Sequence, residues 1–371
     1  MQRVPLKGFS LQELQEFVSS LEEPKFRAKQ LFDWLYTKEA DSFEEMSSLA
    51  KPFRSKLTDM ATIARVRMVN EQKSHTDGTT KLLFELADGK RVESVLIPRR
   101  SGFDGKREPS ASLLDADRLT LCLSTQVGCP LDCAFCATAT MDYERNLDAG
   151  EIVDQLTHAR RAAGRNITNI VYMGMGEPLM NYENVMKSVE IISTAMGVAA
   201  RRITISTAGW AERIRRMADE GRKAKLAISL HSTRDDVRTK LMPINKKFPV
   251  RELLDAVRYY YKKIKQRVTY EYILFDGIND TERDLHDLIK FVKAVPSKVN
   301  IVPFHSIAFT HPDGFAASLH PTPSKRVEKF VEGLRSSHIT VMIRSNAGED
   351  IDAACGQLAL SSHSIPATVY A

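Results

Sequence analysis

The sequence predicts an α/β fold in which a small N-terminal helical accessory domain precedes an open, partial (β/α)6 barrel. From residue 118 onward, apolar runs typical of buried strands alternate with amphipathic helical patterns. Residues 10–61 show helical periodicity instead. The length of 371 residues and a hydrophobic content of 43% suffice for a barrel core and one further domain.

The accessory domain is expected to span residues 1–72 and to contain three helices. Ser10 can cap the first helix, because Glu13 stands at the capping-box position. The second and third helices are expected at 26–36 and 43–57. The accessory domain carries many basic side chains. From composition alone, these can form an ordinary solvated face or a surface that contacts RNA. These side chains include Lys25, Arg27, Lys29, Lys51 and Arg54.

Residues 73–117 are expected to form a β-hairpin and a linker loop. Two β-prone runs within 81–98 flank Asp88-Gly89, which predicts a type I′ turn. Glu93 lies in the second strand among apolar neighbours, and most strand glutamates simply face water. Residues 99–117 are polar and serine-rich, so a flexible loop is expected there.

The barrel is expected at 118–358, with a tail at 359–371. A last strand at 339–344 follows six strand–helix units. In such barrels the chemistry lies at the C-terminal ends of the strands. The six strands are expected at 119–124, 170–173, 203–206, 226–230, 270–274 and 299–302, and the helices at 149–163, 182–195, 210–219, 250–263, 282–293 and 324–334.

A cysteine cluster, Cys129, Cys133 and Cys136, follows the first barrel strand with C-x3-C-x2-C spacing. A tetrahedral zinc site needs a fourth ligand, which is not evident nearby. Three thiolates suit a 4Fe-4S cluster in which one iron stays open to a substrate. A structural zinc knuckle and buried, unligated thiols are the alternatives.

The other strand ends carry polar groups. Residues 174–178 read Gly-Met-Gly-Glu-Pro, where glycines allow close backbone approach and Glu177 can bind an ammonium group. The next two strands end near Ser206 and near Ser229 and His231, which suit ribose and carboxylate groups. Each of these side chains can also be a turn cap or a satisfied core group.

Two cysteines lie outside the cluster. Cys355 follows the last strand, within Asp-Ile-Asp-Ala-Ala-Cys-Gly-Gln-Leu at 350–358, and Cys122 ends the first strand. A lone cysteine is normally a small core residue. If both lie at one barrel mouth, they can form a transient redox pair in a reducing compartment.

Charge and composition indicate which partners and which cellular compartment the protein is expected to have. The formal net charge of +6 weakly favours a polyanionic partner. Five cysteines, an odd number with three clustered, argue against a secreted disulfide framework. The sequence shows neither a signal-peptide pattern nor a membrane-length apolar run, so we expect a cytoplasmic protein without a membrane partner.

Taken together, the cysteine spacing with Cys122, the Gly-Met-Gly-Glu-Pro turn and the Cys355 segment resemble the RlmN/Cfr family of radical-SAM RNA adenine methyltransferases. The resemblance runs from the N-terminal helices to Leu358. It implies a radical-SAM barrel with a 4Fe-4S cluster on the three clustered cysteines. It also implies the use of two molecules of S-adenosylmethionine (SAM) per turnover.

The resemblance also implies a role for each remaining site residue. The first SAM would methylate Cys355, and the second would supply a 5′-deoxyadenosyl radical that activates this methyl group. Cys122 would release the methylated base by forming a disulfide, and Glu93 would accept the proton. His305 occupies a slot that is usually Asn in the family. The implied SAM ligands are Gly176, Glu177, Ser206, Ser229, Leu230, His231 and His305.

The implied substrate is an adenine of 23S rRNA at the peptidyl-transferase centre, before full ribosome assembly, and in the C2 branch also the adenine 3′ of a tRNA anticodon. The implied enzyme is a monomer that takes electrons from a donor such as flavodoxin and its reductase. Ser345-Asn346-Ala347 matches neither branch, and the general pattern favours C2. The alternatives are C8 methylation, a radical-SAM enzyme acting on a non-RNA substrate, and a zinc-stabilised RNA-binding protein.

Overall fold

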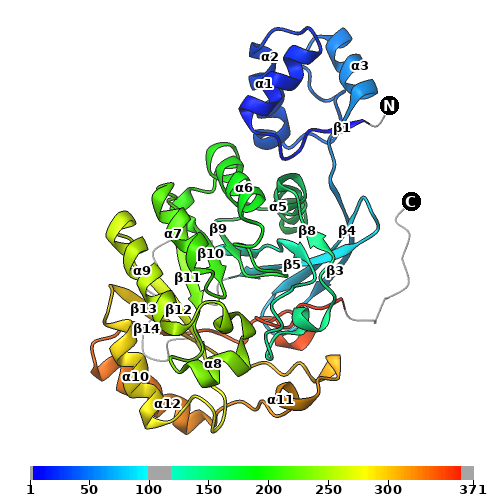
Figure 1. Cartoon of the computed structure of the whole chain (residues 1–371). Coiled ribbons are helices and arrows are strands. Elements are labelled where there is room, and N and C mark those ends of the chain that lie inside the picture. The colour runs from blue at the N-terminus through cyan, green and yellow to red at the C-terminus, as the bar shows by residue number, and fades with distance from the viewer. Residues whose placement is uncertain (1–2, 99–117, 361–371) are drawn as a thin grey trace, which may run out of the picture.

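The structure, a computed structural model, describes residues 3–98 and 118–360. Its centre is a curved sheet with the strand order β14-β13-β12-β11-β10-β9-β6-β5-β4-β3 (Figure 1). All neighbours from β6 to β14 pair in parallel. These strands are β6 (Leu119–Cys122), β9 (Asn169–Tyr172), β10 (Ile203–Thr207), β11 (Lys225–Ser229), β12 (Val268–Ile273), β13 (Ser297–Val302) and β14 (Val341–Ile343).

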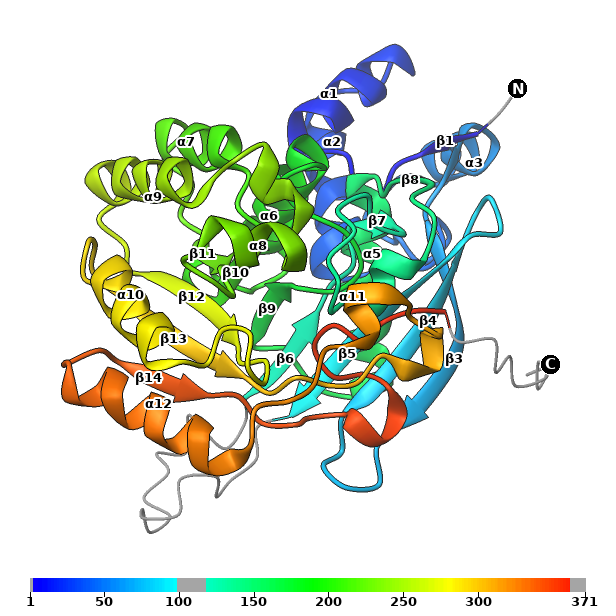
Figure 2. The same ribbon diagram turned by 60° about the horizontal axis from the view of Figure 1, so that its bottom comes forward.

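Helices connect the parallel strands along the outer side of the sheet, as Figure 2 shows for α7, α9, α10 and α12. This arrangement confirms the predicted fold class, a partial (β/α)6 barrel. The order and the positions of the elements follow the hydrophobic pattern closely. The connecting helices are α5 (Ala149–Ala163), α6 (Tyr182–Ala195), α7 (Ala211–Asp219), α9 (Val250–Ile264), α10 (Glu282–Val292) and α12 (Ser324–Ser336), with the short α8 (Asp235–Leu241) and α11 (Gly314–Ala317) beside them.

An antiparallel extension continues the sheet beyond β6. It consists of β3 (Val66–Lys73), β4 (Thr80–Leu86) and β5 (Arg91–Pro98), and β5 pairs with β6. The predicted hairpin is therefore confirmed. The expected type I′ turn is wrong, because it requires two positive φ angles and only Gly89 has one, at 79°.

The turn of this hairpin is a three-residue loop. The Leu86 N–H donates to the Lys90 carbonyl at 2.8 Å, and the Gly89 N–H donates to the Leu86 carbonyl at 3.0 Å. Asp88 has a negative φ, and its carboxylate accepts the Lys90 N–H at 3.1 Å. A loop with glycine at its left-handed position is the next commonest hairpin connection.

The accessory domain contains α1 (Leu11–Ser20), α2 (Phe26–Phe32), which runs into a π-helical turn at 33–37, and α3 (Lys51–Met60). The capping box is confirmed, since Ser10 Oγ accepts the Glu13 N–H and the Glu13 carboxylate accepts the Ser10 N–H. The expected start of the third helix at residue 43 is wrong. Pro52 is tolerated only in a first helical turn, so α3 begins at Lys51.

The accessory domain docks on α5 and α6. The short strands β1 (Val4–Pro5) and β2 (Ala61–Thr62) pair in parallel and close it. Lys7 forms a buried ion pair with Asp154 at 2.7 Å. A Cβ atom on Gly150 would lie 2.1 Å from the Lys7 carbonyl oxygen, so the backbones touch directly. The expected boundary at residue 72 falls inside β3, a strand of the large sheet, and the division into domains remains a proposal.

Two predicted segments lie wholly or mostly outside the described residues. The linker loop at 99–117 lies wholly outside them, and of the tail at 359–371 only residues 359–360 are described. Within the described part of the chain, no helix is long and apolar enough to cross a membrane.

Candidate functional site

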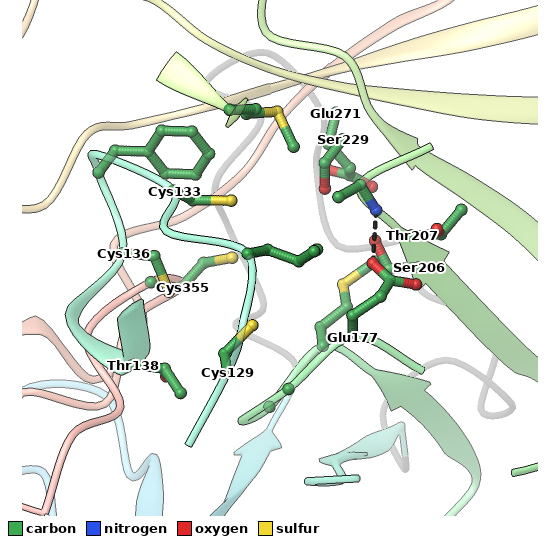
Figure 3. A pocket seen from close by; sticks show the side chains of 18 of the residues that line it. Cys129, Cys133, Cys136, Thr138, Glu177, Ser206, Thr207, Ser229, Glu271 and Cys355 are labelled. Carbon is green, nitrogen blue, oxygen red and sulfur yellow. Dashed lines mark hydrogen bonds between the residues drawn. The ribbon is translucent and has the colours of Figure 1, made fainter. Parts of the chain in front are cut away.

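A cavity opens at the C-terminal ends of the parallel strands (Figure 3). The rule for barrels of this type predicts this location. The cavity brings together most of the residues that the sequence singles out. Its polar and sulfur-bearing lining includes Cys129, Cys133, Cys136, Gly176, Glu177, Ser206, Thr207, Ser229, His231, Glu271 and Cys355.

The cluster loop forms one wall of the cavity. At its entrance Gly128 has a φ of 72°, and a Cβ atom there would lie 2.0 Å from the Asp142 carbonyl oxygen, so only glycine fits. Within the loop, the Cys136 N–H donates to the Cys133 carbonyl at 3.1 Å. The loop rests on α8, because the Ala134 N–H donates to the Leu241 carbonyl at 2.9 Å.

The thiols of this loop share a water-poor environment. Burial raises the pKa of Cys129 to about 12. Burial and then the charges of Cys136 and Cys129 raise the pKa of Cys133 well above its usual range. Three such thiolates are stable together only beside a cationic centre, so the donor set fits an iron–sulfur cluster. Within the described residues, no group of three or more His, Cys, Asp or Glu side chains is arranged to hold a single metal ion.

The Gly-Met-Gly-Glu-Pro turn lies against this loop. Gly176 has a φ of 95°, and a Cβ atom there would lie 2.5 Å from the Cβ of Gln126. The buried Glu177 carboxylate accepts the Leu179 N–H at 2.9 Å and the Ala208 N–H at 2.7 Å. Burial nevertheless raises its pKa. Each carboxylate oxygen has a further lone pair, with which it can accept from an ammonium group.

His231 is held in one defined tautomer. Its Nδ1 accepts the Ile273 N–H at 3.1 Å, so in the neutral ring the proton lies on Nε2. Burial and the charge of Arg238 lower its pKa to about 3, and the ring packs edge-on against Phe135 at 4.6 Å. His231 therefore offers a neutral N–H donor. Leu230 is fully buried and its side chain does not line the cavity.

The two remaining cysteines, Cys122 and Cys355, come from the beginning and the end of the barrel sequence. Cys355 lines the cavity beside Cys136 (Figure 3). The residue is partly open to solvent, but the protein groups around its thiol exclude enough water to raise its pKa to about 11. Cys122 lies buried at the end of β6, where burial and the charge of Cys355 raise its pKa to about 12. The Arg344 guanidinium lowers both pKa values from what burial alone would give.

Glu93 lies on β5, next to the segment that carries Cys355. Its Oε1 is 3.6 Å from the Lys81 ammonium, and its buried Oε2 has no hydrogen-bond partner in the described chain. Burial raises its pKa to about 7, against the lowering effect of Lys81, and the charge of Asp352 adds to the rise. Glu93 does not line the cavity.

His305 is a predicted SAM ligand that lies outside the cavity. It is buried, it does not line the cavity, and its Nδ1 lies 3.4 Å from Glu349 Oε1. A SAM contact by His305 therefore remains a prediction.

Sequence reasoning missed an ion pair inside the barrel. Glu271, inside β12 and two residues before its end, lines the cavity, and its Oε1 accepts from Asn300 Nδ2 at 2.9 Å and from Arg344 Nη2 at 3.3 Å. A carboxylate within an otherwise uncharged, fully buried strand was the available signal.

Sequence reasoning also missed Arg238, a fully buried side chain on α8. Its guanidinium donates to the carbonyls of Ala208 at 2.5 Å and Leu230 at 3.1 Å, and to Asn245 Oδ1 at 2.9 Å. It therefore joins the loops that follow β10 and β11. No short sequence pattern marks such a residue, because its partners lie up to thirty positions away.

Comparisons with known proteins agree with this geometry. One family model, the Radical SAM superfamily, matches residues 123–292, and a second, the N-terminal domain of ribosomal RNA large subunit methyltransferases, matches residues 4–63. The chain is 42% identical over 363 residues to the probable dual-specificity RNA methyltransferase RlmN of Christiangramia forsetii, covering 96% of each chain.

A second relative, the dual-specificity RNA methyltransferase RlmN of Geotalea uraniireducens, is 40% identical, with coverage of 96% of this chain and 97% of the relative. Among solved structures, a radical SAM methyltransferase from Sphaerobacter thermophilus matches with a TM-score of 0.83 and 38% identity. This match covers 96% of the present chain and 99% of the other.

Proposed function

The chain belongs to the RlmN family of radical-SAM RNA methyltransferases, and from this membership we propose that it adds a methyl group to C2 of an adenine in RNA. The observation that carries the proposal is the meeting of Cys355 with the three clustered cysteines in one cavity. An enzyme that only cleaves SAM has no use for a fourth thiol beside its cluster loop.

Cys129, Cys133 and Cys136 would hold the 4Fe-4S cluster. When bound together, the cluster and SAM supply a 5′-deoxyadenosyl radical. The chain orients SAM through the glycine backbone at Gly176, the Glu177 carboxylate and the neutral His231 N–H. Ser206 and Ser229 add hydroxyl groups from neighbouring strand ends. The apolar groups around them exclude water.

Cys355 would carry the methyl group to the base. Adenine C2 is not nucleophilic, so direct transfer from a sulfonium to this carbon is not available. The thiolate of Cys355 attacks the SAM methyl group instead, and two molecules of SAM are used per turnover. The radical that the bound cofactors would supply takes a hydrogen atom from the S-methyl group, and the resulting carbon radical would bond to adenine C2. Glu93, with a pKa near neutrality, would then accept the ring proton while one electron returns to the cluster. Cys122 would attack the Cys355 sulfur and break its bond to carbon; that carbon takes up a proton to become the methyl group of the freed base, and the Cys122–Cys355 disulfide is left for an external reductant.

The names of the relatives describe dual-specificity RNA methyltransferases. We therefore assign 23S rRNA, before full ribosome assembly, and tRNA as substrate classes. The target base must leave its stack to reach a cavity at a barrel mouth.

Flavodoxin with its reductase is the electron donor that we propose, and we propose a monomer that acts in the cytoplasm.

The covalent step gives the sharpest test. A Cys122→Ala protein lacks the thiol that breaks the bond between Cys355 and RNA, so it should be isolated with a nucleotide on the peptide that contains Cys355. A Cys355→Ala protein should form neither adduct nor product. Nuclease digestion followed by peptide mass spectrometry measures this. An inactive Cys122→Ala protein without a nucleotide on that peptide contradicts the assignment of both cysteines.

The position of the methyl group needs a separate measurement. Mass spectrometry of nucleosides from a knockout strain and from its complemented strain should show 2-methyladenosine only in the complemented strain. The appearance of 8-methyladenosine would assign the chain to C8 chemistry instead.

A further inference from the structure

Two segments that are far apart in the sequence meet beside the functional site. One is the turn between β3 and β4, residues 74–79, which we call the clamp turn. The other is the loop after β14, residues 345–358, which we call the Cys355 loop. Figure 2 shows the Cys355 loop, in red, beside the turn between β3 and β4. About 270 residues of chain separate the contacting groups.

Asp77 makes the contact from the clamp turn. Its Oδ1 accepts the Thr79 N–H at 2.8 Å, and its Oδ2 accepts the Gly348 N–H at 2.9 Å. The Asp77 N–H donates to Ser74 Oγ at 3.2 Å, which fixes the turn. Burial would raise the pKa of Asp77, but these hydrogen bonds lower it overall, so the carboxylate is held in its charged form.

Asp350 makes the reciprocal contact from the Cys355 loop. Its Oδ2 accepts the His75 N–H at 3.1 Å, and its Oδ1 accepts from Thr76 Oγ1 at 3.3 Å. Each segment therefore presents a carboxylate to backbone donors of the other. Two carboxylates would repel each other if they faced directly, and this crossed arrangement avoids that contact.

The backbone of the Cys355 loop is shaped for this docking. Gly348 has a φ of 77°, and a Cβ atom there would lie 2.8 Å from Thr79 Cγ2. The Gly348 carbonyl accepts the Ala353 N–H at 2.8 Å, which closes the loop on itself two residues before Cys355. The position of Gly348 thus determines where the segment before Cys355 lies.

The far side of the loop docks on the cluster loop. The Ala137 N–H donates to the Gly356 carbonyl at 2.7 Å, and Thr138 Oγ1 donates to the Leu358 carbonyl at 2.5 Å. Cys355 is therefore fixed between two anchors. One belongs to the cluster wall and the other to the antiparallel extension.

We propose that Asp77 and Asp350 are positioning residues that hold the Cys355 loop against the antiparallel extension, so that Cys355 stays over the cavity. The importance of that placement rests on the proposed function, in which Cys355 carries the methyl group. The same extension carries Glu93. The clamp therefore also fixes the position of Cys355, the proposed methyl carrier, relative to Glu93, the proposed proton acceptor.

Hydrogen–deuterium exchange of the intact holoprotein tests the clamp without reference to activity. In Asp77→Asn, one carboxylate oxygen is replaced by an NH2 donor, so the side chain can accept only one of the Thr79 and Gly348 N–H groups, and the charge is lost. Peptides within 345–354 should exchange at least about tenfold faster than in the wild type. The matched control is Asp88→Asn, the same change at the opposite end of the hairpin, where Asp88 accepts the Lys90 N–H. It should leave these peptides within about twofold of the wild type.

Equal exchange of the loop in Asp77→Asn and the wild type overturns the proposal, and so does an equal rise in Asp88→Asn. Asp77→Asn can also speed exchange within the β3–β4 hydrogen bonds. In that case Asp350→Asn is the deciding variant, because its substitution lies in the Cys355 loop and not in the clamp turn. This variant should speed exchange of the same peptides at least about threefold, and an unchanged rate overturns the clamp.

The reaction gives a readout that a purely structural contact would not change. With RNA present, the ratio of 5′-deoxyadenosine released to adenine methylated should rise at least about fivefold in Asp77→Asn, because the radical forms while Cys355 is misplaced. An unchanged ratio overturns the positioning role. If the wild type itself methylates no adenine, the proposed function fails, while the exchange experiment still decides the clamp.

Discussion

Glu93 owes its chemistry to its buried position on β5, in the antiparallel extension of the barrel sheet. On a solvent-facing strand, the same residue would be an ordinary ionised carboxylate. Here β5 is covered on both sides, the Oε2 atom has no partner in the described chain, and the pKa rises to about 7. A proton acceptor needs a pKa near the working pH, so the environment rather than the residue type supports the proposed role.

A pH profile checks this role. Below pH 7 the ionised fraction of Glu93 falls about tenfold for each pH unit. The single-turnover rate of RNA methylation should therefore fall with it, and the rate in Glu93→Gln should be low and flat. Methylation of Cys355 by SAM without RNA should be unchanged in Glu93→Gln, which serves as the internal control. A variant with the wild-type profile would exclude Glu93 as the proton acceptor.

Arg238 shows what a buried charge does without an acidic partner. Its guanidinium satisfies the carbonyls of Ala208 and Leu230 and the Asn245 amide oxygen, and burial lowers its pKa to about 10. An aliphatic replacement would leave these acceptors buried and unsatisfied, at about 1–3 kcal/mol each.

We therefore expect Arg238→Met to lower the free energy of unfolding by at least about 3 kcal/mol. Lys240→Met removes the same charge from the exposed side of the same helix, α8, and should change stability by less than about 0.5 kcal/mol. Urea unfolding of both proteins measures the difference. Similar values for the two variants would show that the contacts of Arg238 do not stabilise the fold.

At the scale of single residues, the sequence predicted the groups that lie in short motifs. The clustered cysteines, Glu177 and Cys355 carry distinctive local spacing, and the structure brings them to one cavity. Glu271 and Arg238 were missed because their significance lies in contacts with distant residues.

At the scale of elements, sequence rules for helix caps and strand–helix alternation gave correct predictions where the local pattern fits one structure only. The capping box at Ser10 and the strand–helix alternation were predicted. The third helix was placed too early, because its amphipathic pattern extends beyond the point where Pro52 permits a helix to begin. The hairpin was correct but its turn was not, since Asp-Gly serves more than one loop length.

A buried ion pair lies at the contact between the accessory domain and α5. Lys7 and Asp154 are both 2% exposed, and Asp154 also accepts the N–H groups of Arg65 and Val66. Burial would raise the pKa of Asp154, but Lys7 and the backbone donors lower it overall. Removing one partner leaves an uncompensated buried charge, which costs about 3–5 kcal/mol.

Lys7→Met should therefore lower the free energy of unfolding by about 3–5 kcal/mol. Lys187→Met is the control, because its pair with Glu13 is partly exposed and is worth about 0–1 kcal/mol. The folded-state pKa of Asp154 is depressed, so its contribution is complete above the unfolded value of about 3.9 and is lost as pH falls through the folded value. Asp154→Asn should lack that part of the acid transition, and an identical acid transition would refute the role of the pair.

At the scale of the whole molecule, the basic residues of the accessory domain are not equivalent. Arg27 pairs with Glu23, Lys29 pairs with Asp33, and Arg54 donates to the Glu44 carbonyl. Lys25 and Lys51 are exposed. Deleting the domain would also uncover Asp154, so single charge changes test RNA binding more cleanly than truncation.

We expect a Lys25→Gln/Lys51→Gln protein to bind RNA more weakly and with a shallower salt dependence. Removing one lysine–phosphate ion pair should reduce the slope of log K against log salt by roughly 0.7–0.9. The control is Lys290→Gln/Lys293→Gln, the same charge change at two exposed residues on and just after α10. Binding titrations at several salt concentrations measure both slopes, and equal slopes would exclude the two lysines as phosphate ligands.

The clamp turn has a consequence for the order in which the protein is made. The large sheet has two edge strands, β3 and β14, and the Cys355 loop leaves β14 and reaches back to the turn beside β3. A ribosome synthesises the clamp turn early and its partner loop some 270 residues later. Closing a contact of this separation is slow and needs the intervening barrel to be compact. The clamp can therefore close only after the whole barrel between its two halves has been synthesised, so the segment before Cys355 reaches its place late in the folding of the chain.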